Sequence, residues 1–209
     1  MNYHTIDLKT CPRAAHFAYF RDMANPYMGV TAEVDITQFM RLRREAGLPF
    51  YLPLIYRAVH AANDVPEFRR RIVDGGIREY DWCDASHTVA KPDGTYAYCA
   101  LDYQKPLREF LPDAIARQEA VCRGGDIGEG EEAISYFFCS SLPWLTYTAL
   151  VQPTPSPADS NPRLTWGKYF ERDGKTILPF SVLCHHALVD GLHLSRFYEA
   201  LAERLNEKM

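Results

Sequence analysis

Two adjacent histidines, His185 and His186, lie near the C-terminus and are the side chains best suited to chemistry. An imidazole with an unperturbed pKa near 6.5 is largely neutral at cellular pH and can accept a proton. Asp190 and Gly191 follow them. A carboxylate in this place is typical of the first turn of a helix, where exposed N–H groups favour negative charge. The pattern therefore predicts a general base at a turn that leads into a helix.

The elements that must position this base can also be read from the sequence. Residues 176–183 are an apolar run rich in β-forming residues, which predicts a strand. Beyond Gly191, apolar residues recur at helical spacing and charged residues lie between them; the apolar set is Leu194, Phe197, Leu201 and Leu205. The histidine pair is thus expected at a junction between a strand and a helix, where a side chain can face a cleft.

The His-His-x-x-x-Asp-Gly pattern resembles the signature of the chloramphenicol acetyltransferase superfamily, which includes dihydrolipoyl acyltransferase cores and peptide-synthetase condensation domains. Further segments fall in the order and spacing of the chloramphenicol acetyltransferases themselves, so the resemblance covers nearly the whole chain. These segments are Arg13-Ala14-Ala15-His16-Phe17, Val34-Asp35-Ile36-Thr37, Pro66-Glu67-Phe68-Arg69, Ser140-Ser141-Leu142-Pro143-Trp144 and Gly167-Lys168-Tyr169. The resemblance implies an O-acetyltransferase that moves acetyl from acetyl-CoA, a co-substrate, to a hydroxyl of chloramphenicol and so confers antibiotic resistance. It implies no bound cofactor.

Two residues match the catalytic groups of the family. His186 matches the general base, which deprotonates the acceptor hydroxyl so that it attacks acetyl-CoA directly, without an acyl-enzyme. Ser140 matches the serine whose hydroxyl stabilises the tetrahedral oxyanion. His185 is interpreted as a core histidine. The resemblance also implies a homotrimer in which His186 reaches from one chain towards a pocket on its neighbour.

Five further residues match supporting positions of the family. Asp190 and Arg13 match a structural ion pair that braces the turn carrying the histidine. Taken alone, each of these charges would more often be solvent-exposed. Thr165, Trp144 and Tyr169 match positions that line the transition-state water or the coenzyme side, although their residue types also suit packing within a sheet.

The expected acceptor pocket departs from the family pattern. Phe20 stands where a tyrosine is common, and Met28 stands where an aromatic residue is common. Residues 124–132, a polar glycine-rich loop, lack the aromatic-proline segment that often precedes the serine strand. Hydrophobic changes of this kind shift affinity by about 1–3 kcal/mol each. They leave open an alternative function, a related trimeric O-acyltransferase acting on a different hydroxyl acceptor.

Two other classes of protein are disfavoured. A dihydrolipoyl acyltransferase core would be expected to follow a lipoyl or subunit-binding domain with its linker, and none precedes this one in the sequence. A non-catalytic trimeric ligand-binding protein would not need a base, an oxyanion serine and ion-pair residues together. We therefore expect small-molecule substrates as partners.

Length and composition bound the remaining possibilities. A chain of 209 residues, 47% hydrophobic and 24% charged, fits a single domain over 1–209, which the resemblance implies is an acyltransferase domain. A formal net charge of -4 without a long run of Lys and Arg argues against a nucleic-acid partner. Residues 1–9 lack a signal-peptide pattern, and no apolar stretch approaches the roughly 18 residues of a membrane span. We expect a cytoplasmic protein with no membrane partner.

The six cysteines show no CxxC pairing, so reduced and mostly buried thiols are expected. A metal site is disfavoured because consecutive histidines on a strand, such as His185 and His186, point to opposite faces.

The pattern along the chain predicts a two-layer α+β sandwich, with helices packed on a mixed, largely antiparallel sheet. Turn residues at 74–76, 92–94 and 173–174 indicate hairpins. Residues 153–162 are rich in Pro, Ser and Asp and predict a surface loop. Helices are predicted over 10–23, 37–46, 52–63 and 107–122 and after Gly191. Strands are predicted over 30–36, 134–140, 144–151, 164–172 and 176–185.

Overall fold

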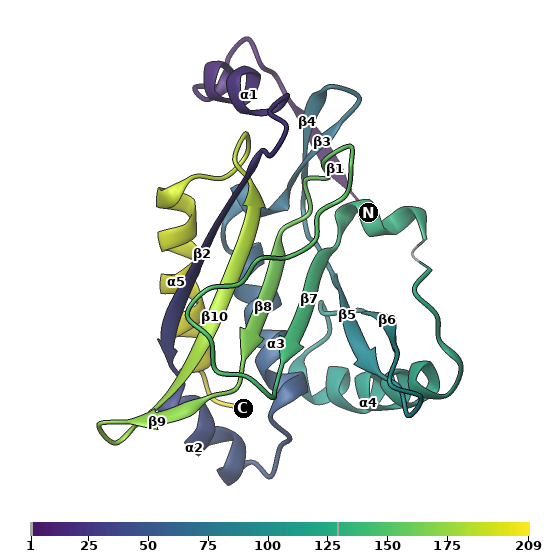
Figure 1. Ribbon diagram of the computed structural model, residues 1–209, viewed down its shortest axis with the longest axis vertical. Helices are drawn as coiled ribbons and strands as arrows, with labels where there is room; N and C mark the ends of the chain where they lie inside the picture. The colour runs from purple at the N-terminus through teal and green to yellow at the C-terminus, as the bar shows by residue number, and fades with distance from the viewer. Residues whose placement is uncertain (1, 129) are drawn as a thin grey trace.

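The computed structural model describes residues 2–128 and 130–209 and is built around one large sheet (Figure 1). Within these residues its strands follow the order β2-β10-β8-β7-β5-β6, and β9 pairs with β10 outside that path. They are β2 (Tyr27–Asp35), β5 (Ala85–Ala90), β6 (Tyr96–Leu101), β7 (Phe137–Leu142), β8 (Arg163–Gly167), β9 (Phe170–Arg172) and β10 (Lys175–His185). β7 runs parallel to both β5 and β8, whereas the other pairings in this sheet are antiparallel. The predicted mixed, largely antiparallel sheet is confirmed.

Tight turns close the hairpins that the sequence predicts. β3 (Arg70–Val73) and β4 (Gly76–Tyr80) are joined through Asp74 and Gly75, which both have positive φ. This conformation suits a two-residue hairpin turn because its twist matches that of the strands. β4 also pairs with β1 (Tyr3–Ile6) in a small antiparallel sheet. The sequence pattern does not predict β1.

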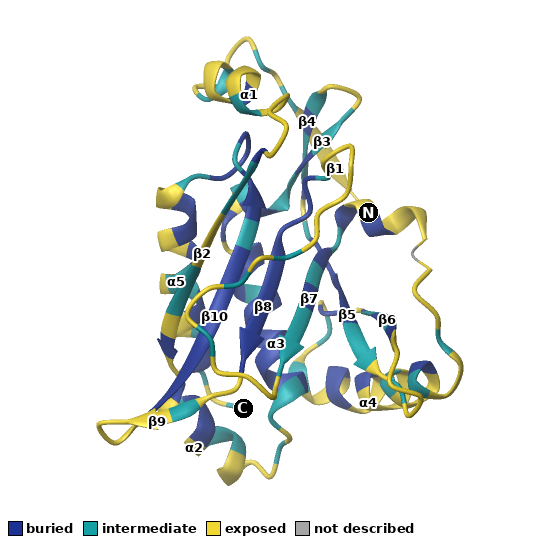
Figure 2. Cartoon of the chain, in the orientation of Figure 1, coloured by how far each residue is buried: buried dark blue, intermediate teal, exposed yellow. Residues whose placement is uncertain are grey.

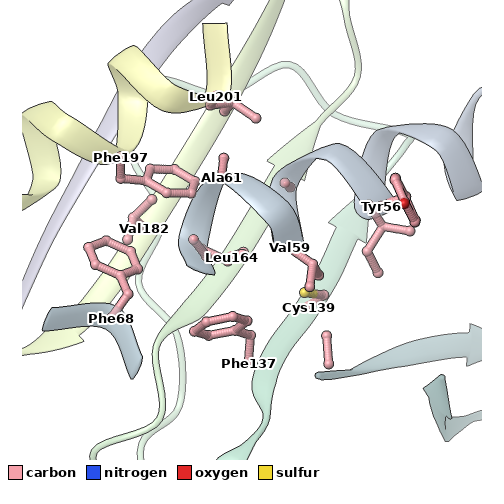
Figure 3. Packing of buried hydrophobic residues seen from close by; sticks show 14 of the residues in the cluster. Tyr56, Val59, Ala61, Phe68, Phe137, Cys139, Leu164, Val182, Phe197 and Leu201 are labelled. Carbon is pink, nitrogen blue, oxygen red and sulfur yellow. The ribbon is translucent and has the colours of Figure 1, made fainter. Parts of the chain in front are cut away.

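Helices cover one face of the large sheet and bury its apolar side chains. They are α2 (Thr37–Glu45), α3 (Tyr51–Asn63), α4 (Leu107–Gly124) and α5 (Gly191–Leu205), close to their predicted bounds. Val59 and Ala61 of α3 and Phe197 of α5 gather with Leu164 and Val182 of the sheet in one hydrophobic core (Figure 3). Apolar burial of this kind contributes about 25 cal/mol per Å² of surface removed from water. The predicted two-layer α+β sandwich is confirmed.

The opposite face is crossed by residues 143–162, which connect β7 to β8 and are called the crossover segment below. Parallel neighbouring strands cannot be joined by a tight hairpin, so the chain must return across the sheet. The strand predicted over 144–151 is therefore wrong, because these residues form a turn and irregular chain that crosses the sheet (Figure 1). Gly167 permits a close approach, since a Cβ there would lie 2.7 Å from the Leu145 carbonyl oxygen. Much of the segment is exposed (Figure 2).

The first helix is shorter than predicted. The pattern predicts it over 10–23, but α1 (Ala14–Phe20) begins later and ends earlier. The preceding residues are held in a turn by Asp7, whose carbonyl oxygen accepts from the Cys11 N–H at 3.0 Å. None of the helices in the described part of the chain has the length and apolarity needed to span a bilayer.

Two strand boundaries also differ from the prediction. The strand predicted over 134–140 begins only after the 3₁₀ turn η2 (Glu131–Ser135). The strand predicted over 164–172 is interrupted between β8 and β9. Of the predicted loop over 124–132, residue 129 lies outside the described residues.

Candidate functional site

His186 lies immediately after β10, where the chain leaves the sheet and turns towards α5. Its backbone N–H donates to the Pro26 carbonyl oxygen at 2.7 Å, and its ring Nδ1 lies 2.9 Å from the Val189 carbonyl oxygen. A carbonyl oxygen only accepts, so Nδ1 carries the proton and Nε2 keeps its lone pair. The Phe20 ring packs against the imidazole with the centroids 4.0 Å apart. His186 thus offers Nε2 as a proton acceptor.

His185 has a different environment from its neighbour. Its side chain is buried beside Tyr27, with the ring centroids 5.9 Å apart. Its Nδ1 accepts from the Ala187 backbone N–H at 3.3 Å. Burial lowers the pKa of His185 to about 4, so the ring is neutral near pH 7. The structure therefore places His185 in the core.

Asp190 is the N-cap of α5 and forms an ion pair with Arg13, which precedes α1. One carboxylate oxygen accepts from the Leu192 N–H at 3.1 Å, and the other accepts from the Arg13 guanidinium. Burial alone would raise the pKa of Asp190, but the hydrogen bond and charge of Arg13, together with interactions with His193, outweigh burial and lower that pKa. The pair ties α1 to the turn that carries His186.

Ser140 lies on β7 and belongs to a row of hydroxyl groups on the sheet face opposite the helices. It is in register with Thr165 on β8, which is in register with Ser181 on β10. Ser140 Oγ lies 3.2 Å from Thr88 Oγ1, and Ser181 Oγ lies 2.7 Å from Thr31 Oγ1. Side chains alternate between the two faces of a strand, so these in-register residues share one face. The row spans β5, β7, β8, β10 and β2.

The crossover segment adds two polar side chains to this row. Thr165 Oγ1 donates to the Gln152 side-chain oxygen at 3.1 Å. The Tyr147 hydroxyl donates to the Thr165 carbonyl oxygen at 3.1 Å and accepts from Ser181 Oγ at 3.2 Å. Burial raises the pKa of Tyr147, which keeps its phenol protonated. The hydroxyl row is therefore linked by hydrogen bonds to the chain that crosses above it.

Ser140 lines two pockets. One of about 370 Å³ is lined by residues of the sheet and of the crossover segment, including Thr88 and Gln152. The other, of about 810 Å³, is lined by Tyr51 and Trp144 among others. Because Ser140 and Thr88 line both pockets, the two pockets meet at this part of the hydroxyl row.

The other predicted residues lie at opposite ends of the strands. Met28 on β2 pairs with Cys184, close to His186. Trp144 follows β7 and is 76% exposed, so it does not pack within a sheet. Tyr169 lies between β8 and β9, with its ring 5.3 Å from that of Phe50.

The candidate residues therefore form two groups within one chain. The base group consists of His186, Asp190, Arg13, Phe20 and Met28. The second group, called the Ser140 group below, contains Ser140 and Thr165, with Trp144 nearby. His186 follows Ser181 by five residues, and Ser181 lies two strands from Ser140; at a strand rise of about 3.3 Å and a strand spacing of about 4.8 Å, the two Cα atoms are roughly 19 Å apart. This separation is too large for both side chains to contact one reacting carbonyl.

Comparison with known proteins identifies the family. A family model described as chloramphenicol acetyltransferase matches residues 1–202. The chain belongs to the chloramphenicol acetyltransferase family. Chloramphenicol acetyltransferase 2 of Haemophilus influenzae is 30% identical, over 96% of each chain. Chloramphenicol acetyltransferase 3 of Escherichia coli is 27% identical, over 100% of each chain.

Solved structures agree with this membership. A chloramphenicol acetyltransferase superimposes with a TM-score of 0.89 at 28% identity, covering 98% of this chain and 100% of the other. Dihydrolipoamide acetyltransferase of Azotobacter vinelandii superimposes with a TM-score of 0.69 at 22% identity, covering 93% and 86% of the two chains. The second likeness shows a shared fold only. The suspected family is thus confirmed.

Sequence reasoning missed several residues of this chloramphenicol acetyltransferase family member. Thr88, Tyr147 and Gln152 contact the hydroxyl row, but their relevance depends on strand register and on the path of the crossover segment. His193 accepts a hydrogen bond from the Asp190 N–H at 3.1 Å. A polar residue three positions after an Asp N-cap is the pattern of a capping box, so His193 could have been found from the sequence.

Proposed function

We propose that this protein is an acyltransferase that moves the acetyl group of acetyl-CoA to a hydroxyl of chloramphenicol, and so confers resistance to that antibiotic. The observation that carries the proposal is the orientation of His186. Its Nδ1–H donates to the Val189 carbonyl oxygen, which leaves Nε2 as a base for the acceptor hydroxyl. Family membership supplies the substrate class.

The proposed reaction needs a base and an oxyanion donor. His186 Nε2 takes the proton of the acceptor hydroxyl while the hydroxyl oxygen forms a bond to the thioester carbonyl carbon. The Ser140 hydroxyl donates to the resulting oxyanion. The intermediate collapses by breaking the carbon–sulfur bond, and the imidazolium returns the proton to the CoA thiolate. No acyl-enzyme forms, and acetyl-CoA acts as a co-substrate with no bound cofactor.

We propose that His186 and Ser140 meet between chains of a homotrimer. The support is their separation within one chain, roughly 19 Å by strand geometry, because one tetrahedral centre must contact both. Large apolar side chains also remain exposed on the crossover segment, notably Val151 at 96%. Such exposure is typical of a surface that another chain covers.

Subunit complementation tests the proposed interface. His186→Ala and Ser140→Ala subunits, each inactive alone, are mixed by co-expression. If sites form between chains, some mixed trimers contain a wild-type His186 facing a wild-type Ser140, and the mixture regains activity. Persistent inactivity of trimers shown by mass spectrometry to be mixed would contradict a site shared between chains.

We propose that Thr165, Trp144 and Tyr169 line the transition-state water or the coenzyme side of this site. Trp144 lines the larger pocket beside Ser140 and is exposed enough to stack on a planar group. Thr165 is one strand from Ser140 and is held by Gln152.

The alternative is a related O-acyltransferase that acts on a different hydroxyl acceptor. Phe20 favours this alternative, since its ring lies against His186 and has no hydroxyl to offer an acceptor. Met28 on β2 pairs with Cys184 at the end of β10 and so places an aliphatic side chain near His186.

The decisive experiment follows CoA thiol release with acetyl-CoA and chloramphenicol, and then with a panel of other hydroxyl compounds at the same acetyl-CoA concentration. Thiol release with chloramphenicol that His186→Ala abolishes supports the leading proposal. Release with another acceptor only, equally dependent on His186, moves the protein to the alternative. Release that persists in His186→Ala rejects the assigned base.

Two broader proposals complete the assignment. Residues 1–209 act as one domain, supported by a single core cluster that draws on helices and strands from Phe17 to Leu205. The working compartment is the cytoplasm, supported by six free cysteines, because disulfides are rare where thiols are kept reduced.

A further inference from the structure

One peptide group, between Val189 and Asp190, is hydrogen-bonded to a histidine at each end. Its carbonyl oxygen accepts from His186 Nδ1–H at 2.9 Å. Its N–H donates to His193 Nδ1 at 3.1 Å. Because both bonds share one planar unit, fixing the N–H also fixes the carbonyl. Hydrogen bonds in series also polarise one another.

His193 is buried, with only 5% of its surface exposed, in the first turn of α5. Its Nε2 lies 3.7 Å from Glu67 Oε1, and Glu67 forms an ion pair with Arg70 at 3.2 Å. A carboxylate facing Nε2 favours the tautomer with the proton on that nitrogen. Nδ1 is then free to accept from the Asp190 N–H.

We propose that His193 is a positioning residue for the acetyl-transfer reaction. It holds the Val189–Asp190 peptide group so that the carbonyl keeps the proton of His186 on Nδ1 and leaves Nε2 as the base. Glu67 sets the tautomer of His193. The inference rests on the proposed role of His186, but the relay itself can be measured without substrate.

The charges around His193 agree with a neutral ring. Burial lowers the pKa of His193, Glu67 and Asp190 oppose this effect, and Arg13 and Arg196 add to it. A neutral ring is required, because a protonated Nδ1 cannot accept. Nδ1 also lies 3.0 Å from Asp190 Oδ1. Protonation would turn Nδ1 into a donor to that oxygen and release the peptide N–H.

Two substitutions at His193 separate the acceptor from the rest of the side chain. His193→Leu removes it, whereas His193→Asn keeps an acceptor oxygen near the position of Nδ1. We expect His193→Leu to lower kcat about 10–100-fold with little change in KM, as when groups that orient metal-bound histidines are removed. We expect His193→Asn to restore most of that loss.

A spectroscopic measurement tests the relay directly. In protein carrying ¹⁵N-labelled histidine, nitrogen chemical shifts report the His186 tautomer at a pH where the ring is neutral. Wild type should show Nδ1–H, and His193→Leu should show a mixture of tautomers. An unchanged tautomer together with an unchanged kcat would overturn the proposal. If His193→Leu does not fold, Glu67→Gln is compared with wild type on the same two readouts, and no change in either would overturn the proposal.

Glu79 provides a matched control for Glu67. Their side chains are 12% and 13% exposed, and Glu79 also pairs with Arg70, at 2.8 Å. Glu67→Gln should change the His193 tautomer, whereas Glu79→Gln should not. Equal effects would reduce Glu67 to a structural ion pair and overturn its part of the proposal. If wild type transfers acetyl but His186→Ala does so equally, the proposed role of His186 as the base fails, and the tautomer data still judge the relay. If wild type transfers acetyl to none of the tested acceptors, the proposed function fails instead.

Discussion

The base group around His186 and the Ser140 group are held in place by different kinds of interaction. His186 is fixed by backbone carbonyls of Pro26 and Val189, and its turn is braced by a charged pair. Ser140 contacts another hydroxyl, that of Thr88, within a row set by strand register. A backbone partner survives most substitutions, whereas a hydroxyl partner is lost with one. The position of His186 should therefore depend on what holds the Val189 carbonyl, whereas the position of Ser140 should depend directly on the Thr88 side chain.

The largest expected effect lies in the base group. His186→Ala should lower kcat by at least about 10²–10⁴-fold, the usual contribution of a positioned base. Its thermal midpoint should stay close to that of wild type, because the imidazole is at the surface end of β10. Steady-state kinetics and calorimetry check this. His185→Ala is the control: if it were the inactive variant and His186→Ala active, the assignment of the two histidines would be reversed.

The next largest loss of activity is expected in the Ser140 group. Ser140→Ala should lower kcat by about 10²–10³-fold, the cost of one oxyanion donor. Thr88→Val, which removes only the partner of Ser140, should lower kcat by less than Ser140→Ala does. Kinetics at saturating acetyl-CoA measures both. If Thr88→Val equals wild type, the hydroxyl row does not position Ser140.

Two buried histidines, His185 next to His186 and His87 next to Thr88, should make the stability of the fold depend on pH. Burial lowers the pKa of His185, and also the pKa of His87 on β5, to about 4. Their ordinary pKa is near 6.5, so the unfolded chain binds more protons in this window and acid destabilises the fold. Each should cost roughly 2 kcal/mol of unfolding free energy between pH 7 and pH 5.

Urea unfolding at the two pH values measures this loss. His87→Phe, which keeps an aromatic ring but cannot be protonated, should be less sensitive to pH than wild type. The same sensitivity in both proteins would mean that His87 does not contribute.

The smallest expected effect concerns the brace of the base group. Asp190→Asn keeps an acceptor for the Leu192 N–H but removes the charge that pairs with Arg13. Because both side chains are partly exposed, we expect a loss of about 1–2 kcal/mol, below the 3–5 kcal/mol typical of a buried pair. Because the pKa of Asp190 is lowered in the folded protein, its charge stabilises the wild type near neutral pH. This stabilisation is lost as pH falls through that pKa. An unchanged unfolding free energy in Asp190→Asn at pH 7 would show that the pair does not brace the turn.

Most of the secondary structure could be predicted from the sequence because it depends on local patterns. α3 and α5 follow from apolar residues at helical spacing, and β10 follows from a continuous apolar run. The turn at Asp173 and Gly174 follows from residues that tolerate positive φ. The prediction of a strand over 144–151 was wrong because these β-forming residues belong to the crossover segment. The parallel pairing of β7 and β8 requires such a connection.

The candidate site divides in the same way. Asp190 and His193 are close to His186 in sequence, so a motif identifies the first and the capping pattern identifies the second. The sequence by itself therefore determined the type of base, the start of α5 and the family resemblance. Only the tertiary structure decided which hydroxyls line up with Ser140, which residues of the crossover segment contact them, and how far the base lies from Ser140. These features depend on strand register and on long-range hydrogen bonds, which no local pattern encodes.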